Sequence, residues 1–186
     1  MFCLEISHRK WFLTAFHQFS NMDGSHHTKE ELMTNVLFVC LGNICRSPMA
    51  EAIFRDLIKT RGLTNQIAID SCATSAEEAG NPPHSGAQAV MKAHHLDYGD
   101  MRSRPITESD FKWADWIITM DNQNVFNLKR LAPSATDAAK IHLCLDIVPG
   151  MAGQEIPDPW YTHRFNETYA SLAEALPLWL DKIQAN

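Results

Sequence analysis

The sequence predicts a single doubly wound α/β domain, built on a mostly four-stranded parallel sheet with helices on both faces. Strand and helix signals alternate from Val36 onward, a pattern typical of a parallel sheet covered by helices. The chain has 186 residues, of which 45% are hydrophobic. That length suits one such domain and is short for two.

The elements follow from hydrophobic periodicity and from the residues that interrupt it. In the first expected helix, Ala52, Ile53, Leu57 and Ile58 form an apolar stripe that ends before Gly62. Short apolar stretches predict four strands, at 36–39, 67–71, 115–120 and 141–143. Apolar residues at helical spacing predict four helices, at 48–61, 85–95, 124–131 and 168–183. Segments 72–83 and 145–161 are expected to be long loops.

Three strand ends carry residues suited to binding or chemistry, namely Cys40, Ser71 and the pair Met120–Asp121. In open parallel sheets, ligands bind beyond the carboxyl ends of the strands. The loops after the first three strands are therefore expected to converge on one crevice.

The stretch from Val36 to Pro48 is the most informative one in the chain. A strand runs directly into Cys40, Arg46 and Ser47 follow, and a helix is expected to begin at Pro48, where a missing N–H costs nothing. Such a loop aims backbone N–H groups and a guanidinium at one point, which suits a dianion such as a phosphate group. The same N–H groups and the helix dipole lower the pKa of a thiol, so Cys40 is expected to act as a nucleophilic thiolate.

The residues inside this loop also suit a phosphate-binding turn. Gly42 and Asn43 are types that tolerate positive φ. The backbone around Leu41, Ile44 and Cys45 is expected to complete the cradle. The spacing also lets Cys45 approach Cys40, so Cys45 either resolves an oxidised Cys40 as a disulfide or simply packs behind the loop.

A second motif, near the end of the chain, supplies a candidate general acid. Asp158 stands between Pro157 and Pro159, which restrict the backbone on both sides and fix its aim. A phenolic leaving group has a pKa of about 10 and leaves poorly without a proton donor. Trp160 and Tyr161 can form an aromatic wall for a phenyl ring. Taken alone, the segment also fits a proline-rich turn with Asp158 as a helix N-cap.

These two motifs together resemble the low-molecular-weight protein tyrosine phosphatases, over about Thr34–Asn186. The motifs are Cys-Leu-Gly-Asn-Ile-Cys-Arg-Ser at 40–47 and Asp-Pro-Trp-Tyr at 158–161, in the order that this family has. The resemblance implies hydrolysis of phosphotyrosine and aryl phosphates through a cysteinyl-phosphate, without a metal or cofactor. It implies that Cys40 is the nucleophile, that Arg46 binds the phosphoryl oxygens and that Asp158 is the acid and then the base.

The resemblance also implies supporting roles. Ser47 would donate a hydrogen bond to the thiolate, and Asn43 would hold the loop through Ser71 and Asn124. Cys45 is the family's neighbouring thiol.

The chain departs from the family pattern at the rim and in the support network. Glu77 stands where an aromatic or other substrate-facing residue is usual, His84 where Asp is usual and Gly86 where Arg is frequent. A supporting histidine of some members is replaced by Asp100 or Met101. These changes bear on substrate preference more than on activity.

Two other functions fit part of the sequence. A thiol-dependent arsenate reductase would need two further cysteines close together, whereas Cys72 and Cys144 are single and distant in sequence. A non-catalytic phosphopeptide-binding relative would be free to lose Cys40 or Asp158, and both are present.

The net charge, the apolar runs and the cysteine spacing indicate which classes of partner and which cellular compartment to expect. The formal net charge of −6 shows no basic field for nucleic acid, and no apolar run approaches the length of a membrane span. Five scattered cysteines without framework spacing favour a reducing, cytoplasmic setting, and no His/Cys spacing resembles a zinc site. We therefore expect a tyrosine-phosphorylated protein as partner, no metal, and no stable membrane association.

Residues 1–33 differ from the domain at 34–186. Trp11 and Phe12 belong to a short apolar patch surrounded by basic residues, and a polar segment follows it. We expect either a disordered extension or a start placed too far upstream, with initiation at Met22 or Met33. An amphipathic helix that docks on a membrane or a partner is the alternative.

Overall fold

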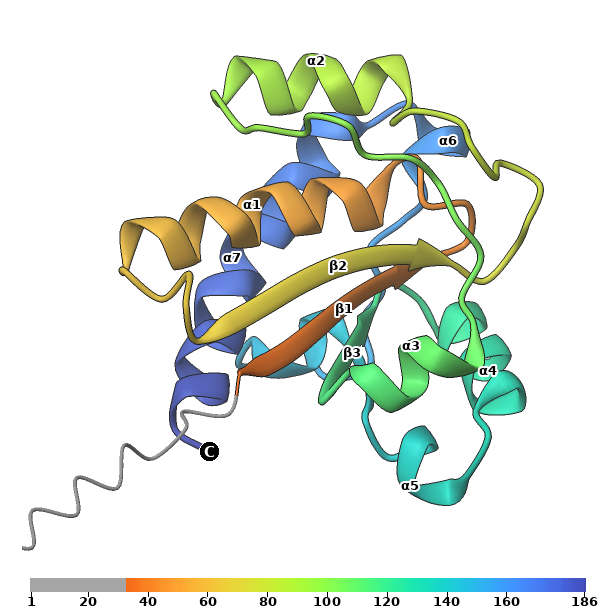
Figure 1. Ribbon diagram of the computed structural model, residues 1–186. Helices are drawn as coiled ribbons and strands as arrows, with labels where there is room; N and C mark the ends of the chain where they lie inside the picture. The colour runs from red at the N-terminus through yellow and green to blue at the C-terminus, as the bar shows by residue number, and fades with distance from the viewer. Residues whose placement is uncertain (1–32) are drawn as a thin grey trace, which may run out of the picture. The chain divides into compact units, whose positions relative to one another are not determined.

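A computed structural model describes residues 33–186. Its centre is a four-stranded sheet in the order β2-β1-β3-β4, in which all neighbouring strands are parallel (Figure 1). The strands are β1 (Thr34–Cys40), β2 (Ile67–Ala73), β3 (Trp116–Thr119) and β4 (Ile141–Leu143). The predicted fold class is confirmed.

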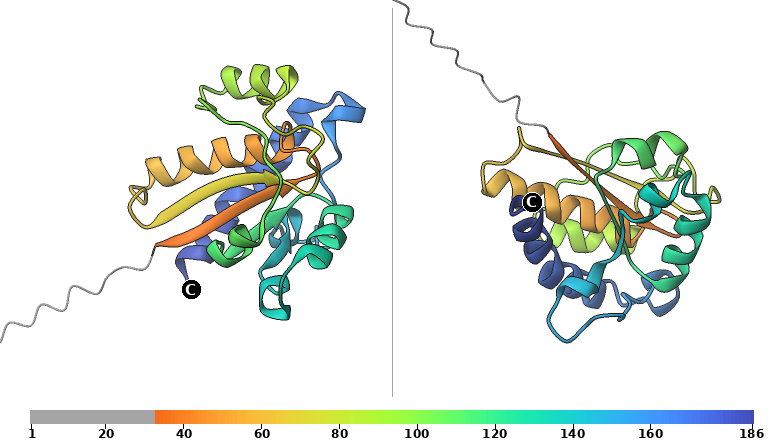
Figure 2. Two further views of the ribbon diagram at one scale, coloured as in Figure 1. Left: turned by 45° about the vertical axis from the view of Figure 1, so that its right-hand side comes forward. Right: turned by 90° about the horizontal axis from the view of Figure 1, so that it is seen from below.

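Helices cover both faces of the sheet (Figures 1 and 2). Side chains alternate along a strand, so Val36, Phe38 and Cys40 face one cluster of buried residues, and Leu37 and Val39 face the other. The first cluster takes its helical residues from α1 (Arg46–Thr60), α2 (Ser85–Ala93) and α7 (Phe165–Gln184). The second takes them from α3 (Glu108–Trp113) and α4 (Asn122–Leu131), with α5 (Ala135–Ala138) at its edge.

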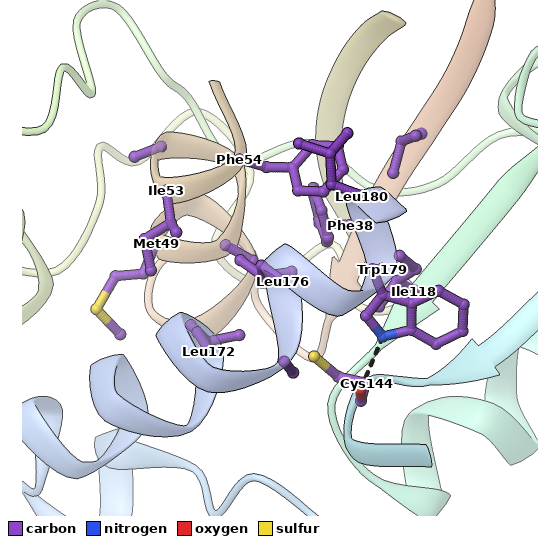
Figure 3. Packing of buried hydrophobic residues seen from close by; sticks show 14 of the residues in the cluster. Phe38, Met49, Ile53, Phe54, Ile118, Cys144, Leu172, Leu176, Trp179 and Leu180 are labelled. Carbon is purple, nitrogen blue, oxygen red and sulfur yellow. Dashed lines mark hydrogen bonds between the residues drawn. The ribbon is translucent and has the colours of Figure 1, made fainter. Parts of the chain in front are cut away.

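The larger cluster anchors α1 and α7 against the sheet (Figure 3). Met49, Phe54 and Leu176 are fully buried in it, and Phe38 meets Phe54 edge to face with ring centroids 5.3 Å apart. Trp179 is also buried, and its indole N–H donates to the carbonyl of Cys144 at 2.8 Å, which satisfies the polar atom of an otherwise apolar ring. This packing fixes the direction of α1, whose first turn forms part of the site.

Several boundaries differ from the prediction. The helix expected to begin at Pro48 begins at Arg46, so Pro48 is its third residue. The prediction was wrong here because none of the first N–H groups of a helix has an intrahelical partner, so proline fits the third position as well as the first. The strand expected to end at Ser71 continues to Ala73, because β1 pairs with β2 up to Cys40–Ala73.

Four short elements were missed. They are α3, α5, α6 (Pro159–Thr162) and the 3-10 helix η1 (Cys144–Ile147), of which η1 and α6 lie in or at the edge of the segment expected to be a loop. Such short helices carry too few residues to show a periodic pattern. The expectations for residues 1–32 lie outside the described residues, so the division at 33/34 stays a prediction.

Candidate active site

The loop between β1 and α1 closes around the sulfur of Cys40. The backbone N–H of Asn43 donates to Cys40 Sγ at 3.2 Å, and Ser47 Oγ lies 3.1 Å from the same sulfur. Within residues 33–186, no side chain caps the N-terminus of α1. The first N–H groups of this helix are therefore open to an anion placed over the loop.

Asn43 is the internal brace of the loop. Its backbone φ is 51°, in the left-handed region that Asn tolerates better than most residues. Its side-chain Nδ2 donates to Ser47 Oγ at 2.9 Å and to Ser71 Oγ at 2.8 Å. Because Ser47 Oγ accepts from Asn43, its hydroxyl hydrogen is available to donate to Cys40 Sγ at 3.1 Å or to the carbonyl of Cys72 at 3.4 Å.

Gly42 serves a purpose other than the predicted one. Its φ is not positive. A Cβ at Gly42 would instead lie 3.2 Å from Cγ of Glu78, a tight contact that only a small shift of the Glu78 side chain would relieve, so glycine lets the two segments approach closely. The Gly42 carbonyl accepts from Ser103 Oγ at 2.8 Å, which ties the loop to a distant segment.

Backbone groups from three other segments hold the rest of the loop. Each contact leaves the N–H groups of the loop free, because the loop is the acceptor in every one. The donors are the N–H groups of Thr74 to Cys40 O at 2.9 Å, Ser75 to Leu41 O at 3.0 Å, His84 to Ile44 O at 2.7 Å and Arg104 to Asn43 Oδ1 at 3.3 Å.

The buried carboxylate of Glu51 extends the hydrogen-bond network of the loop. Glu51 of α1 accepts from the hydroxyl of Ser71 and pairs with Arg55. Burial raises the pKa of Glu51, while the Ser71 hydrogen bond and the Arg55 charge act against that rise. The chain of contacts from Glu51 through Ser71 to Asn43 thus couples α1, β2 and the loop.

Arg46, the first residue of α1, lies buried between two carboxylates. Its guanidinium donates to Asp121 Oδ2 at 2.6 Å, to the carbonyl of Ile156 at 3.2 Å, and to Asp158 Oδ2. Burial alone would lower the pKa of Arg46, but negative charge at Cys40, Asp158 and Asp121 outweighs it and raises that pKa. The Nε of Arg46 is buried and has no hydrogen-bond partner among residues 33–186.

Asp158 is both the N-cap of α6 and a partner of Arg46. Its Oδ1 accepts from the Trp160 N–H at 3.1 Å, and Pro159 is the first residue of the helix. The sequence left two interpretations of Asp158, a cap or a residue of the crevice, and the structure combines them. Figures 1 and 2 show α6 at the end of the sheet to which the strands point.

A cavity of about 140 Å³ opens above Cys40. Trp160 and Tyr161 form part of its wall and are 45% and 72% exposed. Two glutamates, Glu77 and Glu78, lie on the same rim, in the segment that follows β2. The cavity is lined by Cys40, Leu41, Gly42, Ile44, Cys45, Ser75, Glu77, Glu78, Asp158, Trp160 and Tyr161.

The remaining cysteines of the described part are buried and free. Burial raises the pKa of Cys45, and negative charge at Cys40 and Asp158 adds to the rise, so this thiol stays protonated at neutral pH. Burial also raises the pKa of Cys144 to about 12. Cys72 and Cys144 belong to the clusters on opposite faces of the sheet.

Within residues 33–186, no group of three or more His, Cys, Asp or Glu side chains is placed to hold a metal ion. In that same part of the chain, no helix is long and apolar enough to cross a bilayer.

The model of a known protein family matches residues 35–186, and its description is low molecular weight phosphotyrosine protein phosphatase. The chain belongs to this family. Its members act on phosphotyrosine proteins, so the chain is a phosphatase of the protein-tyrosine class.

Individual phosphatases of the family are similar over most of their length. YfkJ of Bacillus subtilis, named a low molecular weight protein-tyrosine-phosphatase, is 43% identical over 135 residues, covering 73% of this chain and 86% of YfkJ. A low molecular weight phosphotyrosine protein phosphatase of Gallus gallus is 40% identical over 151 residues, covering 80% and 94%. The crystal structure of YfkJ superposes with a TM-score of 0.79 at 40% identity, covering 82% of this chain and 96% of YfkJ.

The structure brings together the predicted residues of this phosphatase site with one exception. Asn124 was expected to bond Asn43, but its Oδ1 is buried without a hydrogen-bond partner in the described chain. Its backbone N–H donates to Oδ1 of Asp121, the N-cap residue of α4, at 2.6 Å. The sequence placed Asp121 at the crevice by its position at a strand end but gave it no role, and it missed Glu51 and Ser103, which carry no local signal.

The Asn43 brace makes a testable prediction about stability and activity. Asn43→Ala removes both Nδ2 hydrogen bonds, each worth about 0.5–1.5 kcal/mol. It also places alanine at a φ of 51°, which costs about 1–2 kcal/mol more. We expect kcat/KM for p-nitrophenyl phosphate to fall by about ten- to a hundredfold as the loop loses its shape.

Asn43→Gly is the matched control, because it loses the same hydrogen bonds without the backbone strain. It should lose comparable activity but melt at a higher temperature than Asn43→Ala. Wild-type kcat/KM in both variants would contradict the bracing role.

Proposed function

We propose that this phosphatase hydrolyses phosphotyrosine and aryl phosphates through a cysteinyl-phosphate, with Cys40 as nucleophile, Arg46 as phosphate binder and Asp158 as general acid and base. The partly satisfied guanidinium of Arg46 carries the proposal. A buried Nε–H without an acceptor is costly, and a phosphoryl oxygen above the loop would supply that acceptor. The open N-terminus of α1 beside it favours the same dianion.

In the first half of the reaction, Cys40 Sγ attacks phosphorus and the P–O bond to the aryl group breaks. Asp158, in its protonated form, gives its proton to the departing oxygen. Asp121 and Asp158 hold Arg46 before substrate arrives, and the phosphoryl oxygens take over part of that pairing. The N–H groups of the loop and Ser47 stabilise the charges on phosphate and sulfur.

In the second half, water attacks the phosphorus of the cysteinyl-phosphate. Asp158, now a carboxylate, takes a proton from that water, the S–P bond breaks, and Cys40 returns as a thiolate with release of inorganic phosphate. Each atom of the cycle comes from substrate, water or these two side chains.

The aromatic wall supports an aryl substrate. Trp160 and Tyr161 stand beside Cys40 in the cavity and offer flat apolar faces to a phenyl ring. We propose tyrosine-phosphorylated proteins of the cytoplasm as substrates, in keeping with four free cysteines in the described part of the chain.

The full chain should hydrolyse a phosphotyrosine peptide and p-nitrophenyl phosphate in the presence of EDTA. A peptide of the same sequence with phosphoserine should react at least about a hundredfold more slowly, because an alkoxide is a poorer leaving group than a phenoxide of pKa about 10. Equal rates on both peptides would contradict the aryl preference.

Arsenate reduction with thioredoxin in the same preparations tests the redox alternative. The placement of Cys72 and Cys144 on opposite faces of the sheet gives that relay no support. Reduction of arsenate without hydrolysis of the phosphotyrosine peptide would replace the proposal with the reductase.

A further inference from the structure

His84 links the phosphate-binding loop to α2. Its backbone N–H donates to the carbonyl of Ile44 at 2.7 Å. Its side-chain Nδ1 accepts from the N–H of Gly86 at 3.1 Å and so caps the N-terminus of α2. The backbone bond is independent of the side chain and survives any substitution except proline.

The ring of His84 joins two other aromatic rings. It stacks on Phe165, at the start of α7, with centroids 5.1 Å apart and planes 3° apart. It also meets Trp160 of α6 edge to face at 5.4 Å and 74°. We call His84, Trp160 and Phe165 the aromatic bridge.

Gly86 makes room for the aromatic bridge. A Cβ at this position would lie 2.4 Å from the ring of Phe165, closer than real contacts allow. The two departures from the family pattern, His84 and Gly86, therefore belong together. His84 supplies one ring of the stacked pair, and Gly86 leaves space for the other ring, that of Phe165.

The aromatic bridge bears on Asp158 because α6 is too short to hold its own position. A four-residue helix has almost no intrinsic stability. Pro159 is the one buried residue of α6. Trp160 reaches back to His84 with its ring, while its N–H holds Asp158 Oδ1 at 3.1 Å. His84 thus touches the loop on one side and the helix of the acid on the other.

We infer that His84 is a positioning residue, whose ring holds α6 so that Asp158 stands over Cys40 at the distance that proton transfer requires. The inference rests on the proposed function, since it assumes that Asp158 is the general acid. His84 acts through Trp160 and does not line the cavity itself. The proton-transfer step should therefore depend on His84 more than phosphate binding does.

Two substitutions separate the ring from the cap. His84→Asn keeps a side-chain acceptor for the N–H of Gly86 and loses the ring. His84→Phe keeps a ring of similar width and loses the acceptor. The measurement is kcat/KM across aryl phosphates whose phenols differ in pKa, because this parameter reports on the step in which the aryl group departs.

We expect His84→Asn to lose about tenfold in kcat/KM on phenyl phosphate and little on p-nitrophenyl phosphate, whose leaving group needs less protonation. His84→Phe should keep the leaving-group dependence of the wild type. Inhibition by inorganic phosphate should be unchanged in both variants, because the phosphate-binding loop is intact. In an Asp158→Asn background, His84→Asn should have no further effect on phenyl phosphate.

An equal loss on all substrates in His84→Asn, or no loss at all, would overturn the inference. A steepened leaving-group dependence in His84→Phe would also overturn it. Because His84→Phe is measured independently, the inference can be tested even if His84→Asn does not fold. The single variant Asp158→Asn distinguishes a failure of the proposed function from a failure of the role of His84. If it leaves the dependence unchanged, the proposed function fails; if it steepens the dependence and His84→Asn does not, only the role of His84 fails.

Discussion

Replacing Cys40 with serine should abolish turnover and leave the phosphate site in place. The hydroxyl of serine is a far weaker nucleophile than a thiolate. We expect kcat for p-nitrophenyl phosphate to fall below about a hundredth of the wild-type value. Because Arg46 and the N–H groups of the loop remain, inorganic phosphate should still raise the melting temperature of the variant.

Cys45→Ala is the matched control for Cys40→Ser, since Cys45 lies on the same loop and its raised pKa keeps the thiol neutral. This variant should keep most of its activity. Two results would contradict the assignment of Cys40 as the nucleophile. One is a kcat of Cys40→Ser above a hundredth of the wild-type value, and the other is a fall of kcat below that value in Cys45→Ala.

Replacing Asp158 with asparagine should slow hydrolysis of a phosphotyrosine peptide by about 10²–10⁴, the usual contribution of a general acid. Asparagine keeps the shape of the side chain and its oxygen can still accept from the Trp160 N–H, so the cap of α6 should persist. The loss in kcat/KM should shrink as the leaving group becomes a weaker base.

Asp121→Asn is the control here, because Asp121 also pairs with Arg46 but lies outside the cavity lining. It should weaken the hold on Arg46 and lower kcat/KM to a similar degree for all leaving groups. A uniform loss in Asp158→Asn would instead assign Asp158 the same structural role.

The sequence predicted the parts of the fold that local patterns determine. The four strands are short apolar stretches, the four longer helices show helical periodicity, and the Cys40–Ser47 loop is one contiguous segment. The start of α1 was misplaced because proline fits several positions of the first turn. The short α3 depends on a capping box at Thr107 and Asp110, a signal of four residues without periodicity.

The support of the site could not be predicted in the same way, because its contacts join residues distant in sequence. Ser103 reaches the Gly42 carbonyl across 61 positions, and Glu51 reaches Ser71 across 20. His84 was noted only as a departure from the family pattern. The contact between the rings of His84 and Trp160 depends on how α2, α6 and α7 pack, which no local pattern encodes.

A burst experiment with Asp158→Ala tests whether the reaction passes through a cysteinyl-phosphate on Cys40. p-Nitrophenolate leaves without much help from an acid, whereas hydrolysis of the cysteinyl-phosphate lacks its base in this variant. We predict a rapid burst of about one p-nitrophenolate per enzyme molecule. Mass spectrometry of the quenched enzyme should find a phosphoryl group on Cys40, and Cys40→Ser should show neither signal. A phosphoryl group on another residue, or a burst that persists in Cys40→Ser, would contradict the mechanism.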